Sequence, residues 1–440
     1  MKKILAVAAS LVIAASAFAQ DFQTGYFLQG YTHAYRLNPA FRPAKNFVSL
    51  PGLGEIYAGS RSNIGLNDIL FPLDNGQLGT FMHPDVTSAQ ALGGLKDINK
   101  LSVNSSINLL SFGFKSTHGF FYHTVDINYR TLSSGKVSYN LFKFMKDGIP
   151  SGGSIDIPGT TLDSRSFVEV AYGINFKLGG IISVGARAKY LAGLMGANLN
   201  INNINVRETN GKWMVSGSAD LRVAYKDLAV ETKAGANGTD VIIDGFDNDG
   251  SLINGVSGNG VAIDLGVAVK ILPNLNLSAS ITDLGGISWK NNIRGQSLNT
   301  SWEYNGDSDD IEDDLADLLE LAIAPSDKKF EMLPATFRVG AEYDLLPFIS
   351  LGVLGTQRTG DFSWTEVRGC ANFRLWKILA LTATVATGNF GVTYGGAANL
   401  NLGFLDLYLG MDAIPTKYTP QLVPVEKANI GLCAGLNITF

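Results

Sequence analysis

Residues 244–250 carry acidic side chains at a spacing that could bind calcium. An EF-hand loop places oxygen ligands at alternate positions before a glycine and a glutamate six positions after that glycine. Here Gly245 stands in the first ligand position and Val256 in the last, and neither side chain can bind a cation. We therefore interpret the stretch as a polar turn, with calcium in the loop as the alternative.

The histidines of the sequence likewise form no catalytic or metal-binding motif. None of the four histidines is spaced to pair with a serine nucleophile or with a second metal ligand. The sequence contains no HExxH, GxSxG or phosphate-binding loop motif. We therefore expect no catalytic residue, no metal and no cofactor, and we expect that the protein is not an enzyme. The histidines are His33, His83, His118 and His123.

The composition excludes some classes of partner and favours others. Of the 440 residues only 17% are charged, 50 are glycine, and the formal net charge is −5. No basic patch of the kind that binds nucleic acid is present. Beyond the first residues no apolar run approaches the roughly 18 residues of a membrane-spanning helix. A chain of this kind can cross a membrane only as a closed β-barrel, because lipid leaves backbone polar groups unpaired.

Both ends of the sequence indicate export to an outer membrane. Lys2 and Lys3 precede a short apolar run and the small residues Ala17 and Ala19, so residues 1–19 are predicted to be a cleaved signal peptide. At the other end, every second residue from 430 to 440 is apolar, and the chain finishes on Phe440. A terminal aromatic on such a strand is the signal that we expect the barrel-insertion machinery to read. The alternative is the edge strand of a soluble sandwich.

The intervening sequence alternates between apolar residues and small, polar or charged ones, as β-strands do. Charges fall on one face in strand after strand, which predicts an all-β, transmembrane antiparallel barrel of about 14 strands (12 to 16), one of them at residues 213–223. A lysine or arginine facing lipid would cost about 2–4 kcal/mol, so these charges should face the lumen. The predicted lumen-facing charges are Glu169, Arg187, Lys189, Asp220, Arg222, Asp264, Arg338, Glu342, Arg368, Arg374 and Asp406.

The connections should be short at one end of the barrel and long at the other. The long ones are expected at residues 133–165, 226–258, 285–332 and 412–428. Helical spacing of apolar residues predicts short helices near 88–98 and at 307–321. Cys370 and Cys433 both fall on the face turned away from lipid. They are expected to be separate small lumen residues, with a disulfide between them as the alternative.

Four stretches of the sequence form a recognisable set: LNPAF at 37–41, residues 47–66, ITDLGGISW at 281–289 and LPATFRVG at 333–340. Together they resemble an uncharacterised domain-of-unknown-function family of outer-membrane β-barrels. That family is distantly similar to the long-chain fatty-acid transporter (FadL) and PorV-type barrels. The resemblance implies that residues 20–46, with Asn38, Pro39 and Ala40, form a hatch-like segment in or against the lumen, and that residues 47–440 form the barrel.

Two functions compete at this stage. The resemblance favours substrate-specific passage or binding of a hydrophobic or amphipathic small molecule. The alternative is a non-transporting barrel that acts as scaffold or anchor for an envelope or secreted protein partner. The other expected partners are outer-membrane lipid and the barrel-insertion machinery. A lumen that carries both signs of charge should be plugged or narrow and should not select strongly for either sign of ion.

Overall fold

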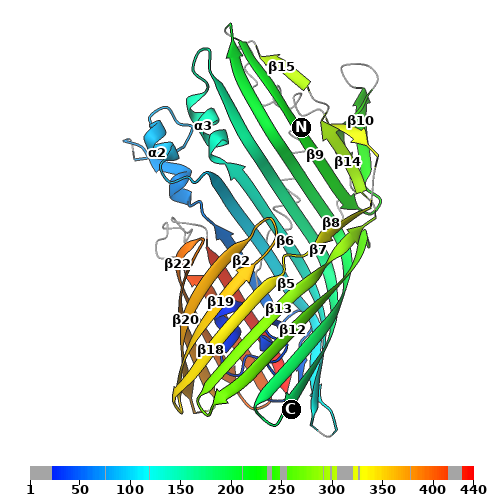
Figure 1. Ribbon diagram of the computed structural model, residues 1–440, viewed down its shortest axis with the longest axis vertical. Coiled ribbons are helices and arrows are strands. Elements are labelled where there is room, and N and C mark those ends of the chain that lie inside the picture. The colour runs from blue at the N-terminus through cyan, green and yellow to red at the C-terminus, as the bar shows by residue number, and fades with distance from the viewer. Residues whose placement is uncertain are drawn as a thin grey trace.

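A closed ring of 14 antiparallel strands forms the wall of the molecule (Figure 1). The computed structural model describes residues 22–74, 76–117, 119–210, 212–234, 240–247, 255–290, 292–297, 300–304, 321–325, 328–376, 378–414 and 429–440. Each wall strand pairs with the next wall strand along the chain, and the last pairs with the first. Thirteen of these strands are uninterrupted: β5 (Ile98–Lys115), β6 (Phe121–Ser138), β7 (Ser154–Leu178), β8 (Ile182–Thr209), β12 (Gly258–Leu272), β13 (Leu275–Trp289), β18 (Thr336–Leu346), β19 (Ile349–Arg358), β20 (Trp364–Leu375), β21 (Leu379–Gly388), β22 (Gly391–Asn401), β23 (Leu405–Ile414) and β24 (Ile430–Thr439).

The first wall strand is broken into β1 (Phe47–Ser49) and β2 (Ile56–Ser62), and both halves pair with β24 and β5. Residues 50–55 leave the ladder between them. Pro51 has no N–H to donate, and Gly52 has a φ of +73°, which favours glycine. Gly54 donates to the Leu50 carbonyl at 2.9 Å, which closes a turn inside the wall. The sequence therefore breaks this strand where it closes the barrel.

The wall is apolar on its outer face and polar on its inner face. On β18, Val339 is 66% exposed while its neighbour Arg338 is 1% exposed. On β20, Val367 is 50% exposed and Arg368 is 2% exposed. A soluble sandwich would bury the valines and expose the arginines, whereas a barrel in lipid needs the arrangement seen here. The predicted all-β barrel of about 14 strands is confirmed.

The two ends of the barrel differ in their connections. At one end the strands join through turns of a few residues, such as 179–181 and 273–274, and at the other end through long segments. In outer-membrane barrels the short turns are periplasmic and the long loops extracellular. We call these the turn end and the loop end. In Figure 1 the turn end lies at the bottom.

Strands β7 and β8 continue past the ring at the loop end and carry a projecting sheet. Beyond Gly193, β8 stops pairing with β12 and pairs with β9 instead. The prediction that residues 213–223 form a wall strand is therefore wrong. Its alternation reflects a small second core around Leu221 and Ile243. The projecting sheet contains β9 (Lys212–Tyr225), β10 (Ala229–Ala234), β11 (Val241–Asp247), β14 (Asn292–Ser297), β15 (Thr300–Tyr304) and β16 (Leu321–Ala324), and β17 (Lys329–Met332) pairs with β13.

Short elements complete the loop end. The predicted helix near 88–98 is found as α2, whose first turn is closed by a capping box between Thr87 and Gln90. Helix α3 lies inside the predicted loop 133–165, most of which is strand. The predicted helix at 307–321 falls almost wholly outside the described residues, as does the signal peptide. No helix among the described residues is long and apolar enough to cross a membrane. The short elements of the loop end are η3 (Leu66–Asp68), β3 (Leu70–Pro72), β4 (Leu78–Thr80), α2 (Ser88–Leu92) and α3 (Tyr139–Asp147).

Residues 22–46 fold inside the ring near its turn end, where Figure 1 shows them in dark blue. We call this segment the plug. Two 3₁₀ turns, η1 (Gln23–Phe27) and η2 (Thr32–Arg36), give it a compact path. Its apolar side chains pack against inward-facing wall residues in a core that includes Tyr57, Leu354 and Tyr408. The plug is therefore a buried part of the fold.

Candidate functional site: the plugged lumen

The start of the plug is fixed by one carboxylate of the wall. Asp412 on β23 accepts hydrogen bonds from the backbone amides of Gln23 at 2.9 Å and Thr24 at 2.6 Å. It also accepts from the Tyr57 hydroxyl at 2.7 Å. Both carboxylate oxygens are thus satisfied although Asp412 is buried. The contact ties the plug to β23 and to β2.

The Asn38, Pro39 and Ala40 motif sits against two glycines that face each other on neighbouring strands. Gly185 on β8 pairs directly with Gly266 on β12. A Cβ at Gly185 would lie 1.9 Å from the Pro39 carbonyl oxygen, and a Cβ at Gly266 would lie 2.1 Å from the Asn38 side-chain oxygen. The glycine pair therefore makes the space that the motif occupies. We call this contact the glycine slot.

Above the motif, nine buried or nearly buried charges form a connected network that we call the lumen ion cluster. The Arg187 guanidinium contacts Asp126 and Asp264, each at 2.8 Å. Arg130 makes two parallel hydrogen bonds of 2.8 Å to Asp283. Contacts of this kind between opposite charges offset the free-energy cost of removing each charge from water. The members are Arg36, Glu55, Asp126, Arg130, Glu169, Arg187, Lys189, Asp264 and Asp283.

Two members of the lumen ion cluster depend on irregular backbone. Asp283 has a φ of +62° at a bulge in β13, and its amide donates to the Asp264 carboxylate at 2.8 Å. Glu55 stands at the end of the break between β1 and β2. Arg36 of the plug reaches Glu55 at 2.8 Å and Asp126 at 3.1 Å. The plug is therefore tied electrostatically to the wall.

The plug also contacts a second set of charges on the wall. Arg338 on β18 donates to the Gln23 side chain at 3.1 Å. Arg368 on β20 donates to Thr24 Oγ1 at 3.0 Å and pairs with Glu366 at 2.8 Å. Buried cations on β18 and β20 thus contact the plug as well.

His33 lies at the centre of the plug. Its imidazole Nε2 is 3.1 Å from the Asn437 side-chain oxygen on β24, and its ring packs against Phe47. Burial, reinforced by the positive charge of Arg36, lowers the pKa of His33 to about 4. The imidazole is therefore neutral at physiological pH and acts as a hydrogen-bonding part of the plug.

The lumen-facing charges predicted from the sequence fall into five groups. Glu169, Arg187, Lys189 and Asp264 belong to the lumen ion cluster, and Arg338 and Arg368 contact the plug. Asp406 accepts a hydrogen bond from Thr32, and Glu342 accepts one from Ser350 at 2.7 Å. Arg374 pairs with Asp344 at 3.0 Å near the turn end, with 36% of its side chain exposed. Asp220 and Arg222 were wrongly placed, because β9 lies in the projecting sheet, where both side chains are partly exposed.

Sequence reasoning missed several charges of the lumen. Asp126 and Arg130 alternate on β6 as clearly as the residues that were chosen, so period-2 spacing could have found them. Asp283 could not have been found this way, because the bulge in β13 changes the alternation there. The missed residues are Arg36, Glu55, Arg61, Asp126, Arg130, Asp283, Glu366 and Asp412.

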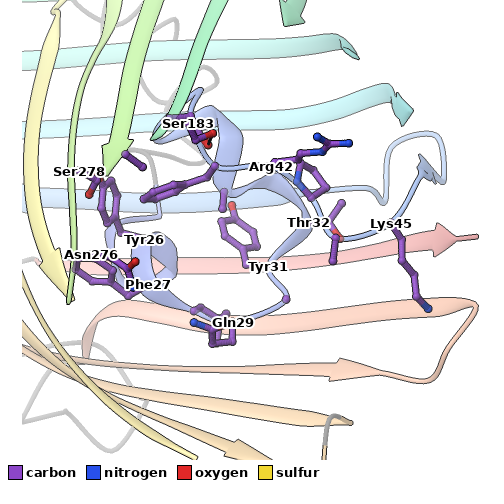
Figure 2. Close-up of a pocket in the computed structure, with 18 of the residues that line it drawn as sticks. Tyr26, Phe27, Gln29, Tyr31, Thr32, Arg42, Lys45, Ser183, Asn276 and Ser278 are labelled. Atoms are coloured by element: carbon purple, nitrogen blue, oxygen red, sulfur yellow. Dashed lines mark hydrogen bonds between the residues drawn. The ribbon is translucent and has the colours of Figure 1, made fainter. Parts of the chain in front are cut away.

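The plug forms the floor of a cavity of about 800 Å³ that opens at the turn end. We call it the cup. Figure 2 shows Tyr26, Phe27 and Tyr31 at this floor, with Arg42 and Lys45 on one side. Ligand pockets of about 300–1,000 Å³ with apolar walls and few polar groups are typical of small-molecule sites. Its basic residues, Arg42, Lys45, Lys115 and Lys177, outnumber its one acidic residue, Glu342.

The remaining candidates are the other histidines, the two cysteines and Phe440. His83 sits in the loop-end segment beside Asp85, and His123 packs against Phe114 and bonds Tyr172 on the outer face. His118 lies outside the described residues. Cys370 and Cys433 are free thiols, as expected. Phe440 ends β24 at the turn end with its backbone bonded to Asn46.

No described part of the chain gathers three or more side chains that could hold a metal ion. Within the calcium-like stretch, Asp244 lies on β11 and its carboxylate is 3.6 Å from the Lys233 ammonium. Residues 248–254 of that stretch and its surroundings fall outside the described residues.

One family model and several solved structures are similar to the chain. The model of a family of unknown function, DUF5723, matches residues 39–412. No curated protein matches the chain. A Pseudomonas aeruginosa FadL homologue is 10% identical with a TM-score of 0.46, covering 97% of this chain and 99% of its own. The toluene transporter TodX of Pseudomonas putida is 7% identical with a TM-score of 0.41, and the alignment covers 96% of this chain and 95% of TodX. The toluene transporter TbuX of Ralstonia pickettii is 9% identical with a TM-score of 0.43, and the alignment covers 92% of this chain and 93% of TbuX.

Proposed function

We propose, starting from the fact that this chain belongs to the DUF5723 family of unknown function, that it binds a hydrophobic or amphipathic small molecule in the cup and passes it across the outer membrane. The observation that carries the proposal is the cup itself. Aromatic side chains of the plug meet a cavity large enough for a drug-sized molecule, inside a wall that otherwise presents polar groups to the lumen.

The plug determines how passage could occur. Its contacts reach the wall at Asp412, at the glycine slot and through Arg36, so the lumen is filled at this level. Passage therefore requires the plug to shift or to be bypassed, which restricts the route to selected molecules. An open general pore would lack such a segment.

The binding step can be tested with 1-aminoanthracene, a neutral fluorescent hydrophobe, added to the mature chain in lipid nanodiscs. Phe41 lines the cup and packs edge-on against Tyr26 at 4.9 Å. Phe41→Ala should weaken binding roughly tenfold, because the loss of a buried aromatic contact costs about 1–2 kcal/mol. Phe373→Ala, a phenylalanine on the outer face of β20, is the matched control and should bind as the wild type does.

Two results would contradict the proposal. One is binding no stronger than that of empty nanodiscs. The other is equal weakening by Phe41→Ala and Phe373→Ala, which would place the probe in the lipid. Passage itself is measured by uptake of the probe into whole cells, where the variant that binds weakly should also take up less.

A scaffold remains the second candidate function, and the projecting sheet favours it. This sheet has a core of its own around Leu221 and extends beyond the ring at the loop end. A photo-crosslinker at Glu231, an exposed residue of β10, should then give one discrete adduct in intact envelopes. The same group at Asn274, in a turn at the opposite end, is the control. Absence of any adduct at Glu231 would argue against the scaffold.

Both functions assume residence in the outer membrane, contact with its lipid, and insertion by the machinery that reads Phe440. We propose that residues 1–19 direct export and are removed. N-terminal sequencing of the protein from an outer-membrane fraction should then begin at Gln20. Removal of Phe440 should lower the amount of folded barrel in that fraction, and an unchanged amount would contradict the proposed role of this residue.

A further inference from the structure

A second cavity lies inside the barrel at the loop end, on the far side of the lumen ion cluster from the cup. It has a volume of about 260 Å³. Its walls come from the loop-end halves of β5, β6, β7 and β8, from β17, and from the connection between β19 and β20. We call it the loop-end cleft. Its size falls just below the usual range of drug-sized pockets, so it suits a ligand of one or two small rings.

The charges that line the loop-end cleft cancel one another. Three acidic and three basic residues line it. Arg165 forms an ion pair with Asp163, with 2.7 Å between nitrogen and oxygen, and Lys329 forms one with Glu331 at 3.3 Å. Asp361 lies 3.9 Å from Lys136. An anion or a cation would find its opposite charge already paired, so the site favours an uncharged ligand.

The same side chains are well suited to hydroxyl groups. Carboxylate, amide and guanidinium groups are planar and can each contact two neighbouring hydroxyls of one ligand. Asp163 and Asn198 stand together, with the Asn198 amide 3.3 Å from the carboxylate. Ser102 and Asn104 face them from β5, joined by a 3.0 Å hydrogen bond. A dense set of planar polar groups of balanced charge is what recognition of a polyhydroxylated ring requires.

One wall of the loop-end cleft adds an aromatic face and a guanidinium. Phe362 lines the cleft and stacks on Phe390 with ring centres 5.5 Å apart. Arg358 lines the cleft as well. A guanidinium carries N–H donors for the oxygens of a hydroxyl-rich ligand, which a hydrocarbon could not use.

We propose that the loop-end cleft is a binding site for a neutral saccharide of one or two rings, presented from outside the cell. The inference does not depend on passage through the plug. It rests on residues that the cup does not contain. A saccharide could therefore bind whether or not the cup binds a hydrophobic molecule.

The test uses the full mature chain in nanodiscs and saturation-transfer NMR with glucose, mannose, galactose, N-acetylglucosamine and their β-1,4-linked disaccharides. Glucuronate and glucosamine serve as charged counterparts. We expect saturable binding of at least one neutral sugar in preference to its charged counterpart. Asn198→Ala should weaken it roughly tenfold, as expected for loss of a polar contact to a buried group. Asp163→Asn, which keeps the shape but removes the charge, should weaken it as well.

Asp344→Asn is the matched control, because it makes the same change at the turn end, where Asp344 pairs with Arg374. It should leave sugar binding unchanged. Heat-modifiable migration on gels verifies that each variant is folded, and Asn198→Ala provides the test if Asp163→Asn does not fold. No binding of any neutral sugar, stronger binding of the charged counterparts, or binding that Asn198→Ala leaves intact would each overturn the proposal. None of these outcomes bears on 1-aminoanthracene binding in the cup.

Discussion

Arg187 shows how much of the lumen depends on single buried charges. Its guanidinium lies between Asp126 and Asp264 with 2% of its side chain exposed. Arg187→Met should destabilise the barrel by about 3–5 kcal/mol, because two carboxylates would lose their shared cation in a site without solvent. Urea unfolding from lipid vesicles measures this.

Arg374→Met is the control for that measurement. Arg374 pairs with Asp344 in a half-exposed contact, which contributes at most about 1 kcal/mol. If the two methionine variants unfold at the same urea concentration, the lumen ion cluster does not hold the wall together.

The burial of His33 predicts that the docking of the plug inside the wall depends on pH. Its pKa is lowered to about 4 when the plug is docked, whereas a released histidine takes up a proton near pH 6.5. Between these values only the released form binds the proton, so docking weakens as the pH falls from about 6.5 to about 4. Because intrinsic amide exchange itself slows as the pH falls, the quantity to measure is the protection factor of the amides in residues 22–46, which should fall across this window.

His33→Gln is the control, because glutamine can keep a hydrogen bond to Asn437 but does not titrate. In this variant the dependence on pH should largely disappear. An identical fall of the protection factors in wild type and variant would show that another group is responsible.

The plug and the wall are in close contact at the glycine slot, where β8 pairs with β12. A side chain added on either strand should therefore displace the plug. Gly185→Ala places a methyl group where the Pro39 carbonyl now lies, 1.9 Å from an added Cβ. Since backbone atoms cannot give way cheaply, residues 38–40 should be displaced from β8 and β12. Limited proteolysis should then cut the plug faster than in the wild type.

Gly369→Ala is the matched substitution on β20, where the nearest atom to an added Cβ is 3.9 Å away. It should leave the plug as resistant to proteolysis as the wild type. Equal cleavage of both alanine variants would mean that the slot does not hold the plug.

At the level of elements, the sequence predicts the wall well and its irregular parts poorly. Alternation of side chains identifies strands such as β18, because lipid on one side and a polar lumen on the other impose it over many residues. The same alternation misplaced β9, since a strand on a small second core also alternates. The break at residues 50–55 and the bulge at Asp283 depend on backbone contacts between distant strands, which periodicity does not encode.

The candidate sites were predictable only in part for a related reason. The Asn38, Pro39 and Ala40 motif was expected in the lumen, but its partners, Gly185 and Gly266, become neighbours only when β8 pairs with β12. The loop-end cleft likewise combines residues from strands that are far apart in sequence.

Along the barrel axis the lumen has three successive levels. The cup opens at the turn end, the plug and the lumen ion cluster fill the middle, and the loop-end cleft lies beyond them. Residues 22–46 fill the lumen at the middle level and also form the floor of the cup. The state of that segment should therefore decide whether the barrel conducts.

Deletion of residues 22–44 tests this at the scale of the barrel. The full mature chain should be electrically silent in a planar bilayer, whereas the shortened chain should form stable channels, because it loses the aromatic core of the plug and keeps all 14 wall strands. A silent shortened chain that still migrates as a folded barrel would mean that the wall side chains alone close the lumen.

The selectivity of the opened channel follows from the charges that remain on the wall. Among the described residues, the barrel buries eight carboxylates and eight arginine or lysine side chains outside the plug. Because the two signs balance, the lumen should attract neither anions nor cations strongly. The reversal potential of the shortened chain in a potassium chloride gradient should therefore lie near zero. Substituting Asp412→Asn in the same chain removes one of these carboxylates and should shift the potential towards anion selectivity, and a shift in the opposite direction would contradict this account of the lumen.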